Sequence, residues 1–178
     1  RGNDLSFPLS APGQPVTNVA ASGIERMLAG EGPAELRCSV DHHDLNYNGR
    51  YDPCVLLDFG EVRTYYLEVD VEGPAGARLL FGHAERLIDD YFQIGHECSF
   101  ADGYVLREGR QTWRASQWRC GRYLRLRVQG AERPVRIHAM RFTETGYPYE
   151  RRGAFESDDD VLAGVFAISR RTIELCSH

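Results

Sequence analysis

The sequence lacks three features that would have pointed to particular classes of protein. It has no run of about 18 apolar residues, so it predicts no membrane-spanning helix, and no signal peptide is evident at Arg1. Its 26 acidic residues outnumber its 21 basic ones, for a net charge of −5, which argues against nucleic acid or an anionic membrane surface as a partner. Nucleophile elbows, Walker loops, Rossmann glycine motifs and HExxH are also missing. We therefore expect a soluble chain without a familiar catalytic motif.

Cysteine is present but in no diagnostic spacing. There are five cysteines and no CxxC pair, and the odd total leaves at least one thiol unpaired in a monomer: Cys38, Cys54, Cys98, Cys120 and Cys176. The pattern favours small buried side chains in a reducing cytoplasm, and one or two disulfides in an exported protein are the alternative. The cytoplasm is thus favoured over secretion.

The middle of the chain shows the alternation that is typical of half-buried strands. From Val62 to Gly73, apolar side chains recur at every second position on one side, and charged or polar ones on the other. The turn Gly73–Gly76 is followed by a second extended piece, Ala77–Gly82, so the two predict a hairpin.

A second set of extended segments lies further along. Leu124, Leu126 and Val128 alternate with polar residues, and Val135–Thr143 follows after a turn, which predicts a second adjacent pair of strands. The strands have short connections and no βαβ alternation. The predicted fold is mainly β, an antiparallel β-sandwich of jelly-roll type followed by one C-terminal α-helix.

The C-terminal segment predicts the helix. Ser157 supplies the oxygen of an N-cap, and Asp158 to Asp160 place negative charge on the first turn, where the helix dipole is positive. Apolar residues then recur at spacings of three and four from Val161 to Cys176, which predicts one face that needs a partner. We interpret the aspartate run as a capping cluster rather than a metal or catalytic site.

Three segments resemble one enzyme family in the same order. These are LLDFGEVRTYYLEVDVEGPAGARLLFGHAERL (Leu56–Leu87), WRCGRYLRLRVQG (Trp118–Gly130) and VRIHAMRFTETGYPYERRGAFESDDDVLAGVFAISRRTIELCSH (Val135–His178). Together they resemble the region in which bacterial α-L-rhamnosidases of glycoside hydrolase family 78 pass from a β-sandwich into a catalytic barrel of α-helices. The resemblance covers about two thirds of the chain, and residues 1–54 match nothing.

This resemblance implies a division of the chain and a parent reaction. Residues 1–150 would be an accessory β-sandwich, and residues 151–178 a linker and the first helix of a truncated α/α-barrel. The family's motif D-x-x-x-D-C-P-x-R-E would follow that helix and is absent, so we expect no catalytic residue and no activity here. The parent reaction would be inverting hydrolysis of a terminal α-L-rhamnoside. The partners implied are a rhamnose-containing glycan, the missing catalytic domain, and a second copy of the chain through helix 161–176.

One constellation in the N-terminal part allows a cofactor. Asp44, Asn46, Asn48 and Asp52 stand at positions 1, 3, 5 and 9 of a loop with Gly49 at position 6, the spacing of an EF-hand calcium loop. Position 12 is Val55, where an EF-hand uses glutamate, so a plain turn between strands explains the same residues. Calcium is the only cofactor that the sequence allows, and both alternatives remain open.

Aromatic side chains supply candidates for binding sugar. Trp113 and Trp118, each followed by arginine in a predicted loop, rank first, and Tyr47 and Tyr51 follow. Aromatic residues of a sandwich also serve as core. The sequence thus predicts a scaffolding accessory domain of a rhamnosidase, with a carbohydrate-binding module, with or without calcium, as the alternative function.

Overall fold

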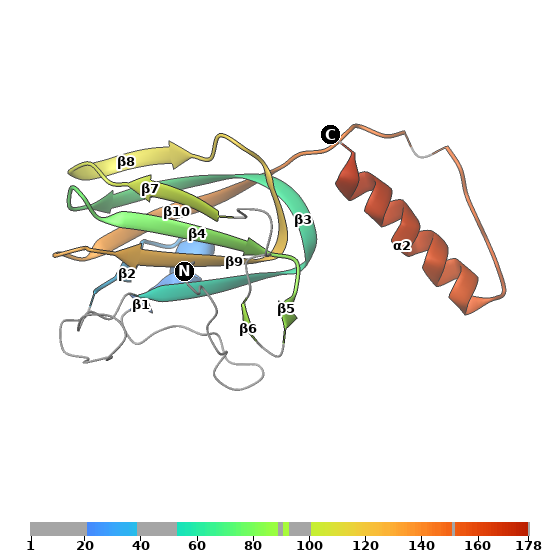
Figure 1. Ribbon diagram of the computed structural model, residues 1–178, viewed down its shortest axis with the longest axis horizontal. Coiled ribbons are helices and arrows are strands. Elements are labelled where there is room, and N and C mark those ends of the chain that lie inside the picture. The colour runs from blue at the N-terminus through green and yellow to red at the C-terminus, as the bar shows by residue number, and fades with distance from the viewer. Residues whose placement is uncertain (1–20, 39–52, 89–90, 93–100, 151, 178) are drawn as a thin grey trace, which may run out of the picture.

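The structure is a computed structural model that describes residues 21–38, 53–88, 91–92, 101–150 and 152–177 (Figure 1). These ranges hold ten strands and two helices. In chain order they are β1 (Ala21–Ser22), α1 (Ile24–Leu28), β2 (Ala34–Leu36), β3 (Cys54–Gly73), β4 (Arg78–Ala84), β5 (Leu87–Ile88), β6 (Tyr91–Phe92), β7 (Ala101–Val105), β8 (Gly109–Arg114), β9 (Arg119–Gln129), β10 (Val135–Glu144) and α2 (Asp160–Cys176). The expectation of a mainly β, antiparallel fold followed by one C-terminal helix is confirmed, and the short helix α1 is an addition that the sequence did not suggest.

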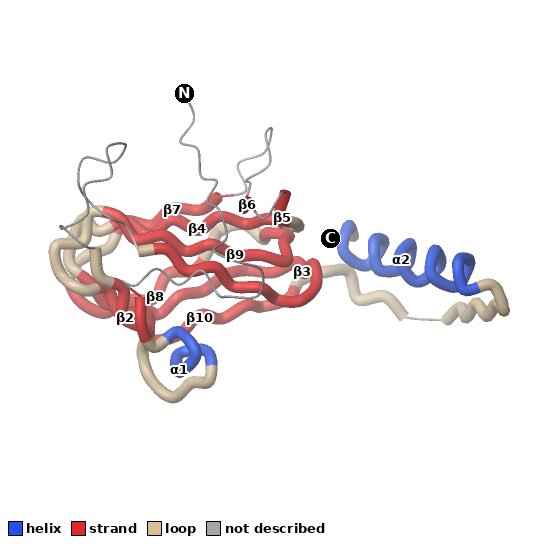
Figure 2. The backbone as a smooth tube through the Cα atoms, turned by 90° about the horizontal axis from the view of Figure 1, so that it is seen from below, coloured by secondary structure: helices blue, strands red, loops and turns tan. Residues whose placement is uncertain are grey.

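Eight of the strands form one continuous antiparallel sheet that folds into two layers (Figure 2). One layer has the order β7-β4-β9-β3, and the other has β8-β3-β10-β2-β1. Strands β5 and β6 form a separate small ribbon. The two layers share β3, so the sandwich is a single hydrogen-bonded unit.

Strand β3 belongs to both layers because it bends. Its first part, from Cys54 to Asp58, pairs with β9, and its last part, from Glu68 to Gly73, lies between β10 and β8. The register with β9 shifts between Asp58 and Arg63. Gly60 sits in this irregular stretch with φ of 77°, a left-handed conformation that glycine adopts without strain. The bend carries the chain from one layer to the other.

The core fills the space between the layers. Tyr65, Leu67, Val69 and Val71 of β3 are at most 1% exposed, so the alternation expected for this segment is confirmed. They pack with buried side chains of β4, β9 and β10 in one cluster, which includes Leu79, Phe81, Leu124, Leu126, Val128, Val135 and Ile137.

The strands were expected to pair with their neighbours in the chain, and this is wrong for both expected pairs. β3 and β4 are consecutive, but β4 pairs with β9 and β7 rather than with β3. Similarly, β9 pairs with β3 and β4, whereas β10 pairs with β2 and β3. Each short connection therefore crosses from one layer to the other instead of joining neighbours. A strand with one apolar face fits either arrangement, because in both of them that face meets the core.

Helix α2 stands beyond one end of the sandwich (Figures 1 and 2). The segment after β10 runs outward along it, and the helix then returns, so that its C-terminal end lies next to the sandwich. Neither helix in the described ranges is long and apolar enough to cross a membrane.

Candidate functional site

The aromatic candidates for sugar binding have different surroundings. Trp113 lies in β8 rather than in a loop, and its ring stacks on Phe81 and Tyr104 with centroid distances of 5.3 and 5.4 Å. Trp118 lies between β8 and β9 and is 40% exposed. Tyr47 and Tyr51 are outside the described residues. Of these four residues, Trp118 is thus the one shown to be exposed, and its use in binding stays a prediction.

The candidate calcium ligands Asp44, Asn46, Asn48 and Asp52 also lie outside the described residues, so the calcium site stays a prediction. Elsewhere, the described part of the chain holds no group of three or more His, Cys, Asp or Glu side chains that could bind a metal ion.

The four cysteines that the structure describes form no disulfide with one another.

Helix α2 begins differently from the expectation. Asp159, not Ser157, is the N-cap: its Oδ1 accepts from the backbone N–H groups of Val161 at 2.8 Å and Leu162 at 3.3 Å. Ser157 Oγ accepts from the Asp159 N–H instead, at 3.1 Å. Either residue type can cap a helix, so the sequence left two candidates two positions apart. The interpretation of the aspartates as a capping cluster agrees with this geometry.

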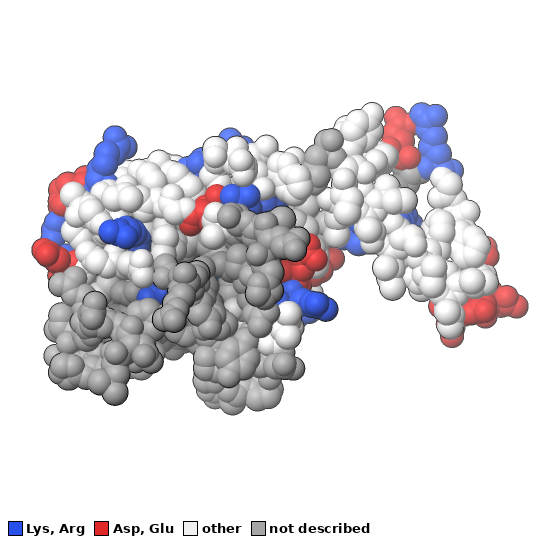
Figure 3. Space-filling view, in the orientation of Figure 1, with Lys and Arg blue, Asp and Glu red and all other residues white. Residues whose placement is uncertain are grey.

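Most of helix α2 is exposed. No residue of the helix is buried, and five of its large apolar residues are more than half exposed: Val161 72%, Leu162 51%, Val165 55%, Ile168 69% and Ile173 57%. Phe166 and Leu175 are less exposed, and the Phe166 ring stacks on Phe155 of the preceding segment at 5.0 Å. Figure 3 shows acidic atoms gathered where α2 begins and few charged atoms along the side facing the viewer. An apolar surface of this kind is typical of a helix whose partner is another chain or domain.

The C-terminal end of α2 is fastened to the sandwich. Arg171 donates to the backbone oxygen of Val62 at 2.9 Å, and the Tyr147 N–H donates to the backbone oxygen of Ser177 at 3.0 Å. Burial, together with the nearby Glu85 carboxylate and the Cys176 thiol, raises the pKa of Cys120 to about 11. The helix is thus held at one end while its length remains uncovered.

A buried polar network lies in the same half of the sandwich. The Tyr65 hydroxyl is 2.8 Å from His83 Nδ1, and His83 Nε2 is 3.2 Å from Asp102 Oδ2, an ion-pair distance without good hydrogen-bond geometry. Arg119 donates two bonds to Asp102, of 2.8 and 2.6 Å. Burial alone would raise the pKa of Asp102, but His83 and Arg119 outweigh it and lower the pKa to about 2.

This network joins four strands and is not open to a substrate. Tyr65, His83, Asp102 and Arg119 come from β3, β4, β7 and β9, and the His83 side chain is fully buried. Sequence reasoning missed the network because its members are far apart in the chain and form no motif. Its chemistry is that of a charge neutralised inside the fold, which stabilises the arrangement of the strands.

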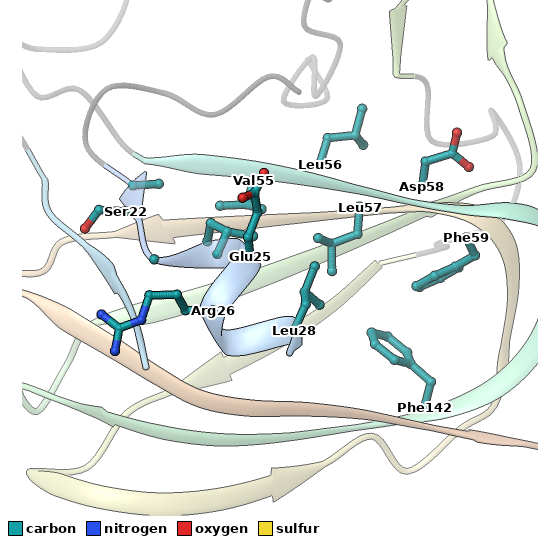
Figure 4. A pocket seen from close by; sticks show the side chains of 13 residues that line it. Ser22, Glu25, Arg26, Leu28, Val55, Leu56, Leu57, Asp58, Phe59 and Phe142 are labelled. Atoms are coloured by element: carbon teal, nitrogen blue, oxygen red, sulfur yellow. The ribbon is translucent and has the colours of Figure 1, made fainter. Parts of the chain in front are cut away.

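A pocket opens at one side of the sandwich, between α1 and the first part of β3 (Figure 4). Its volume is about 770 Å³, within the range of ligand sites. Apolar side chains from three elements line it: Ile24 and Leu28 of α1, Val55, Leu57 and Phe59 of β3, and Phe142 of β10. The rings of Phe59 and Phe142 meet edge to face at 4.8 Å. The sequence reasoning missed this pocket as well, because α1 was not expected.

Comparisons with known proteins support one family resemblance. The chain is similar to the solved structure of a GH78 family rhamnosidase of Bacillus sp. GL1, with a TM-score of 0.66 and 28% identity, over 82% of this chain and 14% of that one. It is also similar in fold to a rhamnosidase from Klebsiella oxytoca with rhamnose bound, with a TM-score of 0.59 and 16% identity, over 83% of this chain and 34% of that one. No protein-family model and no curated protein matches the sequence.

These similarities confirm the resemblance drawn from the sequence: the chain folds as a GH78-like domain. It spans only about a seventh and a third of the two structures that it matches.

Proposed function

We propose that this chain is the scaffolding accessory β-sandwich of an α-L-rhamnosidase-like glycoside hydrolase, and that helix α2 packs against the catalytic part of the enzyme. The observation that carries the proposal is the exposed apolar surface of α2 on a chain that resembles a small part of two rhamnosidases. Residues 1–150 would form the accessory domain, and residues 151–178 a linker and the first helix of the catalytic barrel.

The side-chain chemistry of the described sandwich favours a scaffold over a catalyst. Inverting hydrolysis of a glycoside needs a carboxylic acid and a carboxylate on opposite sides of the sugar. Asp58 and Asp70 are instead bound by two nitrogen atoms each of Arg122 and Arg110, and Asp102 is bound by Arg119 within the fold. Such pairs hold carboxylates ionised, and a general acid must carry a proton. We therefore assign the catalytic acid and base to the catalytic domain of the parent enzyme.

The first test is an assay of the chain by itself on an aryl α-L-rhamnoside. We expect no turnover, because positioned proton transfer accounts for orders of magnitude in rate. Turnover that survives repeated purification and is lost on changing a carboxylate within the chain would refute the accessory role.

The second test addresses α2 as an interface. When the catalytic domain is absent, we expect α2 to pair with α2 of a second copy, since an isolated helix with an uncovered apolar face is marginal in water. Sedimentation should show self-association that Ile168→Glu abolishes and Arg170→Glu, on the same helix, leaves in place. A chain that stays monomeric at high concentration, with α2 amides protected from exchange, would contradict this placement.

Trp118 supports carbohydrate binding as a second candidate function. Trp118 is 40% exposed, and an exposed aromatic residue can stack on the C–H face of a sugar. We expect rhamnose to change the tryptophan fluorescence of the chain, and Trp118→Ala to remove that change, whereas Trp113→Phe should retain it. If saturating rhamnose does not change the fluorescence of the unmodified chain, carbohydrate binding is refuted and only the scaffolding role remains.

A further inference from the structure

The first part of β3 has one edge paired with β9 and one edge that none of the described strands pairs. In an antiparallel pair, opposite residues alternate between those that exchange backbone hydrogen bonds and those that do not. The Val128 N–H donates to the oxygen of Pro53, so these two residues form a bonded pair. The register then makes Val55 and Leu57 the residues bonded to β9, opposite Leu126 and Leu124.

The backbone groups of Cys54, Leu56 and Asp58 therefore face away from β9. Among the described strands, none pairs with β3 on that side between Cys54 and Asp58, since β10 and β8 join β3 only from Tyr65 onward. A row of N–H and C=O groups that no described strand pairs is a template for another strand.

The pocket lies along this same edge. Leu56 and Asp58 are among the residues that line it, yet Figure 4 shows their side chains on the side of β3 away from α1. Figure 4 also shows the ribbon of β3 at these residues running past α1, so the pocket follows this edge. Leu57 and Phe59 point toward α1, where Leu28 is 55% exposed. A donor and acceptor edge thus runs beside an apolar groove.

We propose that this edge and groove bind an extended polypeptide segment, which adds to the sheet as a strand beside Cys54–Asp58. Its backbone bonds to Leu56, and every second side chain is apolar and enters the groove between β3 and α1.

This proposal goes beyond the accessory role and does not depend on it. A small apolar molecule could also enter the groove, but it would leave the backbone edge unpaired. The strand uses both features of the site.

The probe is an acetylated hexapeptide of alternating valine and arginine, added to the full chain while amide hydrogen exchange is followed. Without peptide, the Leu56 amide should exchange freely while the Val55 and Leu57 amides are protected. With peptide, exchange at Leu56 should slow by roughly tenfold or more. The same peptide with every backbone amide N-methylated cannot donate along its backbone and should have no effect.

Two substitutions separate the edge from the groove. Leu56→Pro removes an N–H that the β9 ladder does not use, so the fold should persist and peptide binding should be lost. Leu28→Glu should also abolish binding by placing charge in the groove. Val105→Glu on β7, where the wild-type side chain is 58% exposed, is the matched control and should bind as the wild type does. Because Leu28→Glu leaves β3 unchanged, it tests the site even if Leu56→Pro fails to fold.

Three results would overturn the proposal. The first is a Leu56 amide already as protected as that of Leu57 in the chain alone, which would mean that the edge is occupied. The second is equal binding of the N-methylated peptide, which would make the groove a site for apolar molecules in general. The third is no protection of Leu56 at millimolar peptide.

Discussion

Apolar side chains have opposite fates in the sandwich and in helix α2. Leu67, Leu79 and Leu124 are fully buried between the two layers, whereas Leu162 of α2 is 51% exposed and Ile168 is 69% exposed. Both regions carry regular apolar patterns, with period two in the strands and periods of three and four in the helix. The difference shows that a pattern specifies which face seeks burial, while the supply of a partner depends on the rest of the protein. In the sandwich, the apolar face of each layer packs on that of the other layer.

The contrast is tested most strongly by truncating one leucine in each region. Leu79→Ala should lower the free energy of unfolding by about 2–5 kcal/mol, because it leaves a cavity between the layers. Leu162→Ala should change it by less than about 0.5 kcal/mol in the monomeric chain, since about half of this residue is already exposed to water. Urea denaturation of both variants measures the difference, and similar losses would mean that α2 is packed in solution.

Acid should weaken the sandwich through Asp102. Its pKa of about 2 in the fold lies below the ordinary value of 3.8, so the carboxylate stabilises the folded state above about pH 4. That contribution, on the order of 2 kcal/mol, disappears as the pH falls from about 4 toward 2. Asp102→Asn should be less stable than the wild type at pH 7 and should lose this part of the pH dependence. Glu108→Gln, which removes an exposed partner of Arg133, is the control and should keep the pH dependence that comes from Asp102. If the curves of stability against pH run parallel for the wild type and Asp102→Asn, Asp102 is not its source.

The N-cap of α2 should affect the helix and not the sandwich. Asp159→Ala removes the oxygen that accepts from Val161 and Leu162, at a typical cost of about 1 kcal/mol to a helix. At a concentration where the chain is monomeric, α2 lacks a packing partner, so we expect a loss of helical circular dichroism at an unchanged melting temperature of the sandwich. Asp158→Ala, one position earlier, should retain the helix. A lower melting temperature in Asp159→Ala would show that the two regions unfold together.

The smallest expected effect comes from the contact between the two regions. Arg171→Ala removes the bond to the backbone of Val62 from a side chain that is 43% exposed, so stability should fall by less than about 1 kcal/mol. The informative readout is faster exchange of the Tyr147 amide, which is bonded to Ser177 at the end of α2. Arg170→Ala should leave that exchange unchanged. Unaltered exchange in Arg171→Ala would show that Arg171 does not hold the helix.

The elements were predictable from the sequence where local pattern decides, and their partners were not. The alternation in Val62–Gly73 and the cap and stripe of α2 are local, and both elements are present. Whether β3 and β4 form a hairpin or cross between layers depends on a partner, β9, that lies much later in the chain. The apolar faces of the strands satisfy both arrangements equally.

The same reasoning explains what was missed at the candidate sites. Phe59 and Phe142 meet only because β3 bends and β10 runs beside it, and His83 reaches Asp102 only through the pairing of β4 with β7. No spacing in the sequence encodes either contact. Trp113 was expected in a loop with Arg114, but both residues belong to strand β8, and the Trp113 ring stacks on Phe81.

The shared strand β3 also affects the way in which the chain is made. Cys54 lies opposite Arg127 of β9, and Glu72 lies opposite Arg136 of β10. Each part of β3 therefore pairs with a strand that is synthesised much later. Proteins dominated by such distant pairings fold in milliseconds to seconds, and synthesis proceeds at about 5–20 residues per second. Neither layer can therefore be completed before β9 and β10 leave the ribosome, and until then the apolar strand Cys54–Gly73 is exposed to chaperones and to other nascent chains.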